Sequence, residues 1–258
     1  MSSANLAFGI DIGGSGIKGA IVDLDTGSFA TDRVRIPTPH PSTPDAVAQT
    51  CKALIEQFDL PQEMPIGITF PAPVVRNTVI FIANLDPSWA GVDVADFMWS
   101  KLGRKVYAVN DADAAGYAEV VYGAAKDVPG TIIVTTLGTG IGSAIIFDGN
   151  LLPNTELGHL EIDGKDAESR ASSAQKERRN WSYKQWAKRL QRYYSHVEML
   201  FSPDLFVVGG GISRKHKKFL PLLELKTPIV PAKLRNTAGI VGAAALAAAE
   251  LTEESHDS

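Results

Sequence analysis

The chain has almost no cysteine and no apolar run long enough to cross a membrane. Cys51 is the only cysteine among 258 residues, which excludes an internal disulfide and any zinc site built from several cysteines. The longest uncharged run of small residues, 238–249, is shorter than the roughly 20 apolar residues that span a bilayer. No basic region followed by an apolar stretch precedes the first strand, so we expect no signal peptide. These absences predict a soluble, cytoplasmic protein without a membrane partner.

Size and composition are those of an ordinary globular protein. Apolar residues make up 45% of the chain and charged residues 21%, so extensive disorder is not expected outside the polar ends. A chain of 258 residues is close to the length at which one hydrophobic core divides into two. We therefore expect two lobes.

Negative charge is scarce in one part of the chain. Residues 165–235 hold 16 Lys and Arg against 6 Asp and Glu, a balance of +10, whereas residues 1–130 hold 9 against 15, a balance of −6. Clustered Lys and Arg raise the local concentration of phosphate-rich ligands. The basic segment is therefore either a solvated helix face or a track for a polyanion, and the sequence leaves both open.

Two stretches share the pattern strand, glycine turn, strand. They are residues 6–25, LAFGIDIGGSGIKGAIVDLD, and residues 131–147, TIIVTTLGTGIGSAIIF. Glycines at this spacing can turn several backbone N–H groups toward one phosphate, although a plain hairpin turn has the same pattern. A dinucleotide fingerprint is disfavoured, because it needs a helix after the glycines. The repetition predicts a duplicated lobe with one phosphate-facing turn in each half.

Particular residues at these turns suit a phosphate donor. Asp11 ends the first strand, where a carboxylate can hold a hydrated Mg²⁺, and Ser15 and Lys18 can reach phosphate oxygens. A later stretch, DLFVVGGG at residues 204–211, is a strand followed by three glycines that admit a flat base or a phosphate chain. The predicted donor-binding residues are Gly13, Gly14, Ser15, Lys18, Gly138, Thr139, Gly140, Gly210 and Gly211.

A second polar group follows the strand expected at residues 106–109. Asn110 and Asp111 lie between that strand and an alanine-rich helix. An Asp at a helix start is most often an N-cap. It can also accept the proton of a hydroxyl that attacks phosphorus, as phosphoryl transfer requires.

The remaining helices and strands place other candidate residues. Cys51 lies on the apolar stripe of a helix that starts at Pro44, so we interpret it as a core residue rather than a nucleophile. Asn84 and Trp89 either form a wall for a sugar or, in the case of Trp89, close a local core. Further elements are predicted as a strand at 65–70 and helices at 94–102, 181–201 and 238–251. The helix at 181–201 carries Trp186, Leu190, Tyr193, Val197 and Leu200 as core or dimer seam.

Together these motifs resemble the ROK family of sugar kinases. The resemblance rests on DIGGSGIK at 11–18, Asn110-Asp111, LGTGIG at 137–142, the ExGH pattern from Glu156 to His159, and DLFVVGGGIS at 204–213. It implies an α/β, two-lobed actin/hexokinase-like (ribonuclease H-like) ATPase fold with duplicated lobes and a cleft between them. The lobes would comprise residues 1–109 and 110–258, and the last helix could pack back on the first.

The resemblance also implies roles for single residues. Asp111 would be the general base, Asp11 would hold Mg²⁺ through water, and the sugar would be bound by Asn84, Asn110, Asp111, Glu156, His159 and Glu168. Most members follow ExGH with a cysteine-rich zinc motif that ends in Glu. Residues 162–174 contain no cysteine, so no zinc is expected, while Glu168 keeps the end of that pattern. Ala72 departs from the glycine usual between the two prolines.

The missing zinc motif and the basic C-terminal half resemble the polyphosphate glucokinase branch, which includes polyphosphate/ATP glucomannokinases. This implies a homodimeric kinase of carbohydrate metabolism that phosphorylates the 6-hydroxyl of glucose, with mannose as a further acceptor, from polyphosphate or ATP with Mg²⁺. The alternatives are an ATP-only hexokinase for another hexose and a non-catalytic sugar sensor. The family's repressors carry a DNA-binding segment before the first strand. Here only residues 1–5 precede that strand, so no nucleic-acid partner is expected. An actin-like assembly protein would leave ExGH unexplained.

Overall fold

The computed structural model describes residues 5–80, 82 and 85–256. The chain forms two compact units, each around its own β-sheet. Unit 1 comprises Met1–Ala118 with Thr237–Ser258, and unit 2 comprises Glu119–Asn236. The boundary at residue 110 inferred from sequence stays a prediction, because compactness does not show which segments fold independently. Among the described residues, no helix is long and apolar enough to span a membrane.

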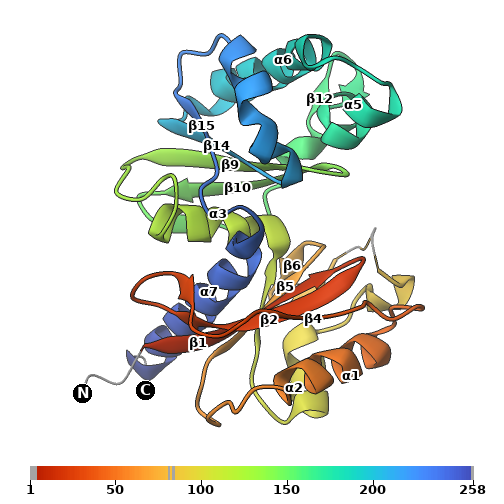
Figure 1. Cartoon of the computed structure of the whole chain (residues 1–258), viewed down its shortest axis with the longest axis vertical. Helices are drawn as coiled ribbons and strands as arrows, with labels where there is room; N and C mark the ends of the chain where they lie inside the picture. The colour runs from red at the N-terminus through yellow and green to blue at the C-terminus, as the bar shows by residue number, and fades with distance from the viewer. Residues whose placement is uncertain (1–4, 81, 83–84, 257–258) are drawn as a thin grey trace. The chain divides into compact units, whose positions relative to one another are not determined.

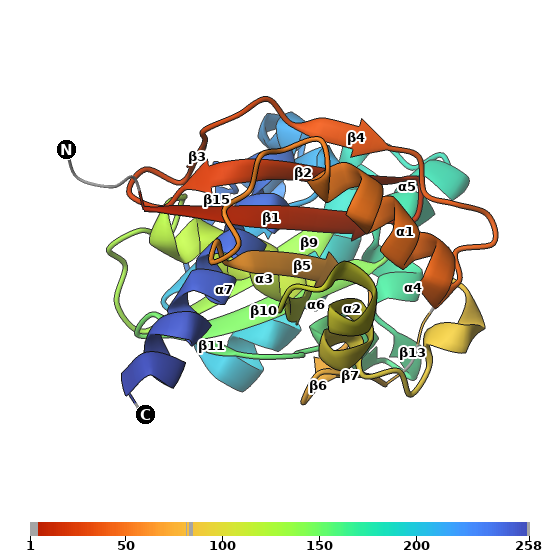
Figure 2. The same cartoon turned by 90° about the horizontal axis from the view of Figure 1, so that it is seen from below.

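The sheet of unit 1 contains the first predicted hairpin. β1 (Leu6–Gly13) pairs with β2 (Gly16–Asp23), which confirms that prediction. Strands lie in the order β3-β2-β1-β5-β8, with β4 also on β2, and Figure 2 shows β2, β1 and β5 side by side. β1, β5 and β8 run parallel, so their carboxyl ends meet at one edge. The other strands are β3 (Ser28–Phe29), β4 (Val34–Ile36), β5 (Ile66–Phe70) and β8 (Tyr107–Asn110).

Helices cover both faces of this sheet. α1 (Pro44–Ile55) and α2 (Val94–Leu102) lie on one face, and α7 (Ala238–His256) lies on the other (Figure 1). Gly9 and Gly67 face α7, where an added Cβ would overlap the carbonyl oxygens of Ile240 and Ala243. α7 therefore lies directly on the strand backbones, and it continues beyond the predicted end at residue 251.

Two open questions of unit 1 are settled by burial. Trp89, at the end of η1 (Pro87–Trp89), is 0% exposed, and its Nε1 donates to the carbonyl oxygen of Ser42 at 2.9 Å. It closes a local core and offers no wall to a sugar. Cys51 is also buried, and burial raises the pKa of its thiol to about 12. The thiol is a core group, as predicted. A small hairpin, β6 (Val74–Val75) with β7 (Thr78–Val79), completes the unit.

The sheet of unit 2 contains the second predicted hairpin. β9 (Thr131–Leu137) pairs antiparallel with β10 (Ile141–Phe147) and parallel with β14 (Leu205–Gly209). The strand order is β11-β10-β9-β14-β15, with β11 at Asn150–Leu152 and β15 at Ile229–Pro231. One face packs on α6 (Tyr183–Phe201). The end of α3 (Asp111–Val121) and the segment after it contribute to the core of the other face.

The apolar stripe of α6 is buried over most of its length. Trp186, Leu190, Tyr193 and Val197 are at most 1% exposed, whereas Leu200 is 50% exposed. Leu200 is not a core residue, because the buried part of the stripe ends with Val197. The alternative that Leu200 belongs to a dimer seam stays a prediction.

Short elements connect β11 to α6 and β14 to β15. Asp163 and Gly164 both have positive φ, as a two-residue type I′ hairpin turn requires, and they join β12 (Glu161–Ile162) to β13 (Lys165–Asp166). No element was predicted for this segment, although its Asp-Gly pair is a hairpin signal. The others are η2 (Leu157–His159), α4 (Glu168–Ala171), α5 (Ser173–Arg178), η3 (Gly211–Lys218), η4 (Leu220–Leu222) and η5 (Arg235–Thr237).

Candidate active site

The first glycine turn, in unit 1, is held by two side chains that sequence reasoning missed. Thr38 Oγ1 donates to the carbonyl oxygen of Gly13, and Arg35 Nη2 donates to that of Ser15 at 2.6 Å. Arg35 is exposed and pairs in register with Lys18 across β2 and β4. β4 has only three residues, so no periodicity marked it. The turn therefore carries a guanidinium beside the residues expected to face phosphate.

Asp11 and Lys18 form an ion pair in unit 1. Lys18 Nζ lies 2.7 Å from Asp11 Oδ2, and Thr69 Oγ1 donates to Asp11 Oδ1 at 3.1 Å. Lys18, a predicted phosphate contact, is therefore held at the predicted metal ligand. A carboxylate oxygen accepts about two bonds, so each oxygen of Asp11 keeps acceptor capacity. This oxygen donor set suits Mg²⁺, a hard cation that retains water.

Asn110, and not Asp111, caps the first turn of α3. Asn110 Oδ1 accepts from the backbone N–H of Ala112 at 2.8 Å and of Asp113 at 3.2 Å. Asp111 is the first residue of α3 and is exposed. An N-cap role would have explained an acid at position 111, but Asn110 fills that role.

Asp11 and Asp111 lie at the same edge of the unit 1 sheet. In register, Asp11 pairs with Thr69 of β5, which pairs with Val109 of β8. Two strand spacings separate β1 from β8 at this level, about 10 Å. The predicted metal ligand, the first glycine turn and the predicted base therefore share one edge, as expected from strand ends in a parallel arrangement.

The second glycine turn, in unit 2, packs against two other segments. The carbonyl oxygen of Gly138 accepts from Ser173 Oγ at 2.9 Å and from the N–H of Ala174 at 3.1 Å. Gly210 has a φ of 79°, and a Cβ there would overlap backbone atoms of Leu137. Only glycine fits this position. The structure thus brings the glycines after β14 to the turn between β9 and β10.

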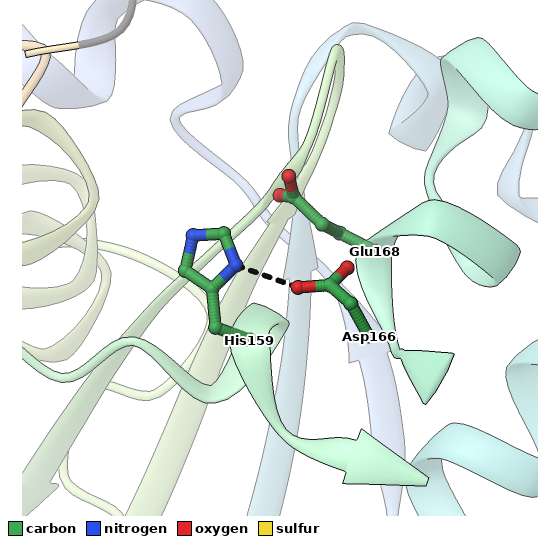
Figure 3. Close-up of side chains that lie close together, drawn as sticks. All are labelled: His159, Asp166 and Glu168. Carbon is green, nitrogen blue, oxygen red and sulfur yellow. Dashed lines mark hydrogen bonds and ion pairs between the residues drawn. The ribbon is translucent and has the colours of Figure 1, made fainter. Parts of the chain in front are cut away.

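Predicted sugar ligands lie beside this second turn. Glu168 Oε2 accepts from the backbone N–H of Ile141 at 3.0 Å, and a Cβ on Gly140 would overlap the Glu168 carboxylate. His159 Nδ1 lies 2.8 Å from Asp166 Oδ2. Figure 3 shows His159, Asp166 and Glu168 converging from η2, β13 and α4. Asp166 was not predicted, because its partner is brought to it by the β12–β13 hairpin.

These three side chains form a compact polar cluster. One ligand atom from each of His159, Asp166 and Glu168 lies within 4.8 Å of the others. Such a group has the chemistry to hold either a sugar hydroxyl or a cation. The expectation that the protein needs no zinc rests on the missing cysteines and stays a prediction.

The pKa values of His159 and of the nearby Glu156 are both raised. The hydrogen bond with Asp166 raises the pKa of His159; partial burial opposes this, and the charges of Glu168, Asp166 and Glu156 reinforce it. Burial raises the pKa of Glu156, against the charge of His159 and together with that of Glu168. The raised pKa widens the pH range over which the imidazole of His159 is charged. In that charged form Nδ1–H donates to Asp166 and Nε2–H is left to donate.

Asp166→Asn is expected to lower the pKa of His159 toward the ordinary value of 6.5, because the amide keeps the shape but loses the charge. NMR titration of the His159 ring signals measures this, with the other histidine signals of the same spectrum as control. Since the folded-state pKa lies above 6.5, the pair stabilises the fold fully below that pH and loses its contribution as pH rises through the folded-state pKa. An unchanged His159 titration would contradict the assignment.

The structure thus collects the predicted residues into two sets. Asp11, Ser15, Lys18, Asn110 and Asp111 belong to unit 1, and Gly138, Gly140, Gly210, Glu156, His159 and Glu168 belong to unit 2. Asn84, predicted to bind sugar, lies outside the described residues.

Comparison with known proteins gives a consistent result. Residues 7–172 match the model of the ROK family. The chain is 52% identical to a polyphosphate glucokinase of Mycobacterium tuberculosis over 246 residues, covering 95% of this chain and 92% of that protein.

Solved structures extend the likeness to the fold. The crystal structure of an inorganic polyphosphate/ATP-glucomannokinase from Arthrobacter sp. strain KM is 52% identical, with a TM-score of 0.87, over 96% of this chain and 99% of that one. A ROK family glucokinase from Streptomyces griseus, at 24% identity, has a TM-score of 0.77 over 94% of this chain and 99% of that one. The predicted α/β, actin/hexokinase-like fold class is confirmed. The chain belongs to the ROK family.

Proposed function

We propose that the protein is a glucokinase that transfers a phosphoryl group from polyphosphate or ATP to the 6-hydroxyl of glucose. One observation carries the proposal: Glu168 accepts from Ile141 N at 3.0 Å, next to the turn Gly138–Gly140. A carboxylate suited to sugar hydroxyls is thereby attached to a backbone turn suited to phosphate. The 52% identity to a polyphosphate glucokinase supports the choice of both substrates.

Asp111 is the general base in this proposal. Its carboxylate accepts the proton of the 6-hydroxyl as the oxygen bonds to the terminal phosphorus and the donor's bridging P–O bond breaks. The side chain is exposed at the start of α3, while Asn110 holds that turn in place. Because Asn110 caps α3, capping does not account for the acid at position 111, and this supports a chemical role for Asp111.

The proposed sugar ligands include Asn110, Glu156, His159 and Glu168. When His159 is protonated, its Nδ1–H donates to Asp166 and its Nε2–H can donate to a sugar hydroxyl; when it is neutral with the proton on Nδ1, Nε2 can accept instead. Glu168 keeps acceptor capacity beyond its bond to Ile141 N. Glu156, whose pKa is raised by burial, can donate when protonated and accept when charged. Asn84 is proposed as a further sugar ligand, and mannose as a further acceptor.

Backbone amides bind the donor phosphates. The proposed hydrogen-bond donors to phosphate are the N–H groups at Gly13, Gly14, Thr139, Gly140, Gly210 and Gly211, with Ser15 and Lys18. The N–H of Gly138, also predicted as a contact, donates to the carbonyl oxygen of Gly140 at 3.0 Å and so shapes the turn. Arg35, whose guanidinium already contacts the first turn, adds positive charge there. Asp11 would hold Mg²⁺, which neutralises donor charge when bound. Catalysis then rests on positioning and electrostatics.

The proposal is tested by assaying glucose-6-phosphate formation with polyphosphate and with ATP, each with Mg²⁺ and with a chelator. We expect glucose to be phosphorylated with polyphosphate and with ATP, and we expect this turnover to be lost when a chelator removes Mg²⁺. Mannose and other hexoses serve as alternative acceptors. Turnover with ATP alone would overturn polyphosphate as donor, and absence of turnover with every pair would overturn the kinase. Size-exclusion chromatography tests the proposed homodimer, and elemental analysis tests the expected absence of zinc.

A further inference from the structure

Unit 2 carries a surface on which four cations lie over aromatic rings. Lys176 Nζ is 4.5 Å and Lys218 Nζ 5.4 Å from the ring centroid of Tyr183. The guanidinium carbons of Arg179 and Arg189 lie 5.7 Å and 5.4 Å from the ring of Trp181. We call these six residues the basic–aromatic surface; they come from α5, α6, the link between these two helices, and η3.

None of the four cations has a carboxylate partner among the residues that the structure describes. The ion pairs of unit 2 are instead His159–Asp166 and Arg192–Asp163. A ring attracts a cation without neutralising it. Further exposed cations lie on the same elements, namely Arg178, Lys184, Lys188, Lys215 and Lys217. The surface therefore keeps its positive charge.

The rings hold like charges close together. Lys176 and Lys218 share the ring of Tyr183, so their nitrogens are separated by at most the sum of the two distances, 9.9 Å. Charges within about 10 Å repel each other at an ionic strength near 0.1 M. Tyr183 in turn stacks on buried Phe219, with an interplanar angle of 11°. An anion between the two ammonium groups would relieve their repulsion with little rearrangement of the rings.

Two of the segments that carry the surface, α5 and η3, begin at the second glycine turn. α5 starts where Ser173 Oγ and Ala174 N bond to the carbonyl oxygen of Gly138. η3 starts after Gly210, which is packed on Leu137. Lys176 on α5 and Lys218 on η3 are therefore carried by segments that start beside the proposed donor site. A ligand that starts at the turn and continues along the surface must be a long chain with many negative charges.

We infer that the basic–aromatic surface binds the part of a linear polyphosphate chain that extends beyond the phosphates held at the glycine turns. This rests on the proposed function. A long polyphosphate reaches the surface and gains charge-assisted hydrogen bonds from it. ATP and tripolyphosphate end near the turn and gain little.

The test compares two double variants in direct binding of polyphosphate by calorimetry. Lys176→Gln/Lys218→Gln removes two charges from the surface and keeps the side-chain stems. Lys52→Gln/Lys226→Gln is the control, since it removes two exposed lysines elsewhere, and Lys226 is next to Thr227, which bonds to Glu198 near the other end of α6. Thermal unfolding of both variants checks their folding.

The surface variant is expected to bind long-chain polyphosphate about tenfold more weakly than the control, with a salt dependence reduced by about one unit of slope per lost contact. Binding of tripolyphosphate and the KM for ATP should change less than about twofold, since these ligands lack the extension. Equal weakening of long and short ligands, or none, would overturn the inference. If the unaltered protein binds polyphosphate but turns over only ATP, the donor in the proposed function fails while the surface is still tested by binding.

Discussion

Asp111→Asn is expected to lower kcat for glucose phosphorylation by about 10²- to 10⁴-fold, the range for loss of a general base. Asparagine keeps the size of the side chain but cannot take the hydroxyl proton. The cap of α3 is unaffected, because it comes from Asn110 Oδ1. The dissociation constant of glucose, measured by calorimetry, should remain within a few-fold of the original, since Asn can still hydrogen bond.

Asp96→Asn is the matched control for this variant. Asp96 also lies in the first turn of a helix, α2, and is exposed. It loses the same charge at an equivalent helix position, where an acid contributes favourably to the helix dipole. Its kcat should be unchanged. Turnover of Asp111→Asn close to that of the control, with glucose still bound, would remove Asp111 from its role as base.

Glu168→Gln is expected to raise the dissociation constant of glucose by about 10- to 100-fold, because a hydrogen bond to a charged group contributes about 1.5–3 kcal/mol. The amide oxygen of Gln can still accept from Ile141 N, so the second turn should keep its shape and the KM for the donor should change little. The charge of Glu168 also raises the pKa of His159. This pKa should therefore be lower in the Glu168→Gln variant.

A second substitution separates the two roles of Glu168. Glu168→Ala removes the acceptor for Ile141 N as well as the charge. Its KM should rise for the donor in addition to glucose, whereas Glu168→Gln affects glucose alone. Glu161→Gln, an exposed acid in the same segment, is the control and should change neither constant. A donor KM that rises equally in both Glu168 variants would contradict the separation.

The two hairpins show what local sequence determines. β-branched apolar runs interrupted by closely spaced glycines predicted β1–β2 and β9–β10, and the structure confirms both. Helix α1 was predicted from Pro44 and its apolar stripe, and the structure has it at Pro44–Ile55. These features depend on neighbours within a few residues, where backbone sterics and side-chain periodicity decide the conformation.

Residue pairs from distant segments were beyond the sequence. Even for the local cap, Asn110 and Asp111 were equally eligible by residue type, and Asn110 is the cap because β8 ends there and α3 begins at Asp111. Arg35 at Ser15 and Asp166 at His159 follow from the pairing of β4 with β2 and of β12 with β13. The sequence left open whether Trp89 faces a sugar or a core. The tertiary structure buries it, and its indole N–H donates to the carbonyl oxygen of Ser42.

The sequence by itself determined the α/β elements, the glycine turns, the family, and most of the residues on which the proposed chemistry depends. It also determined the positive charge of residues 165–235. Only the tertiary structure decided that cations of this segment lie over the rings of Tyr183 and Trp181, and that α5 begins beside the Gly138 turn. The physical reason is that strand and helix formation is a local preference, whereas the partner of a charged side chain depends on how distant segments pack.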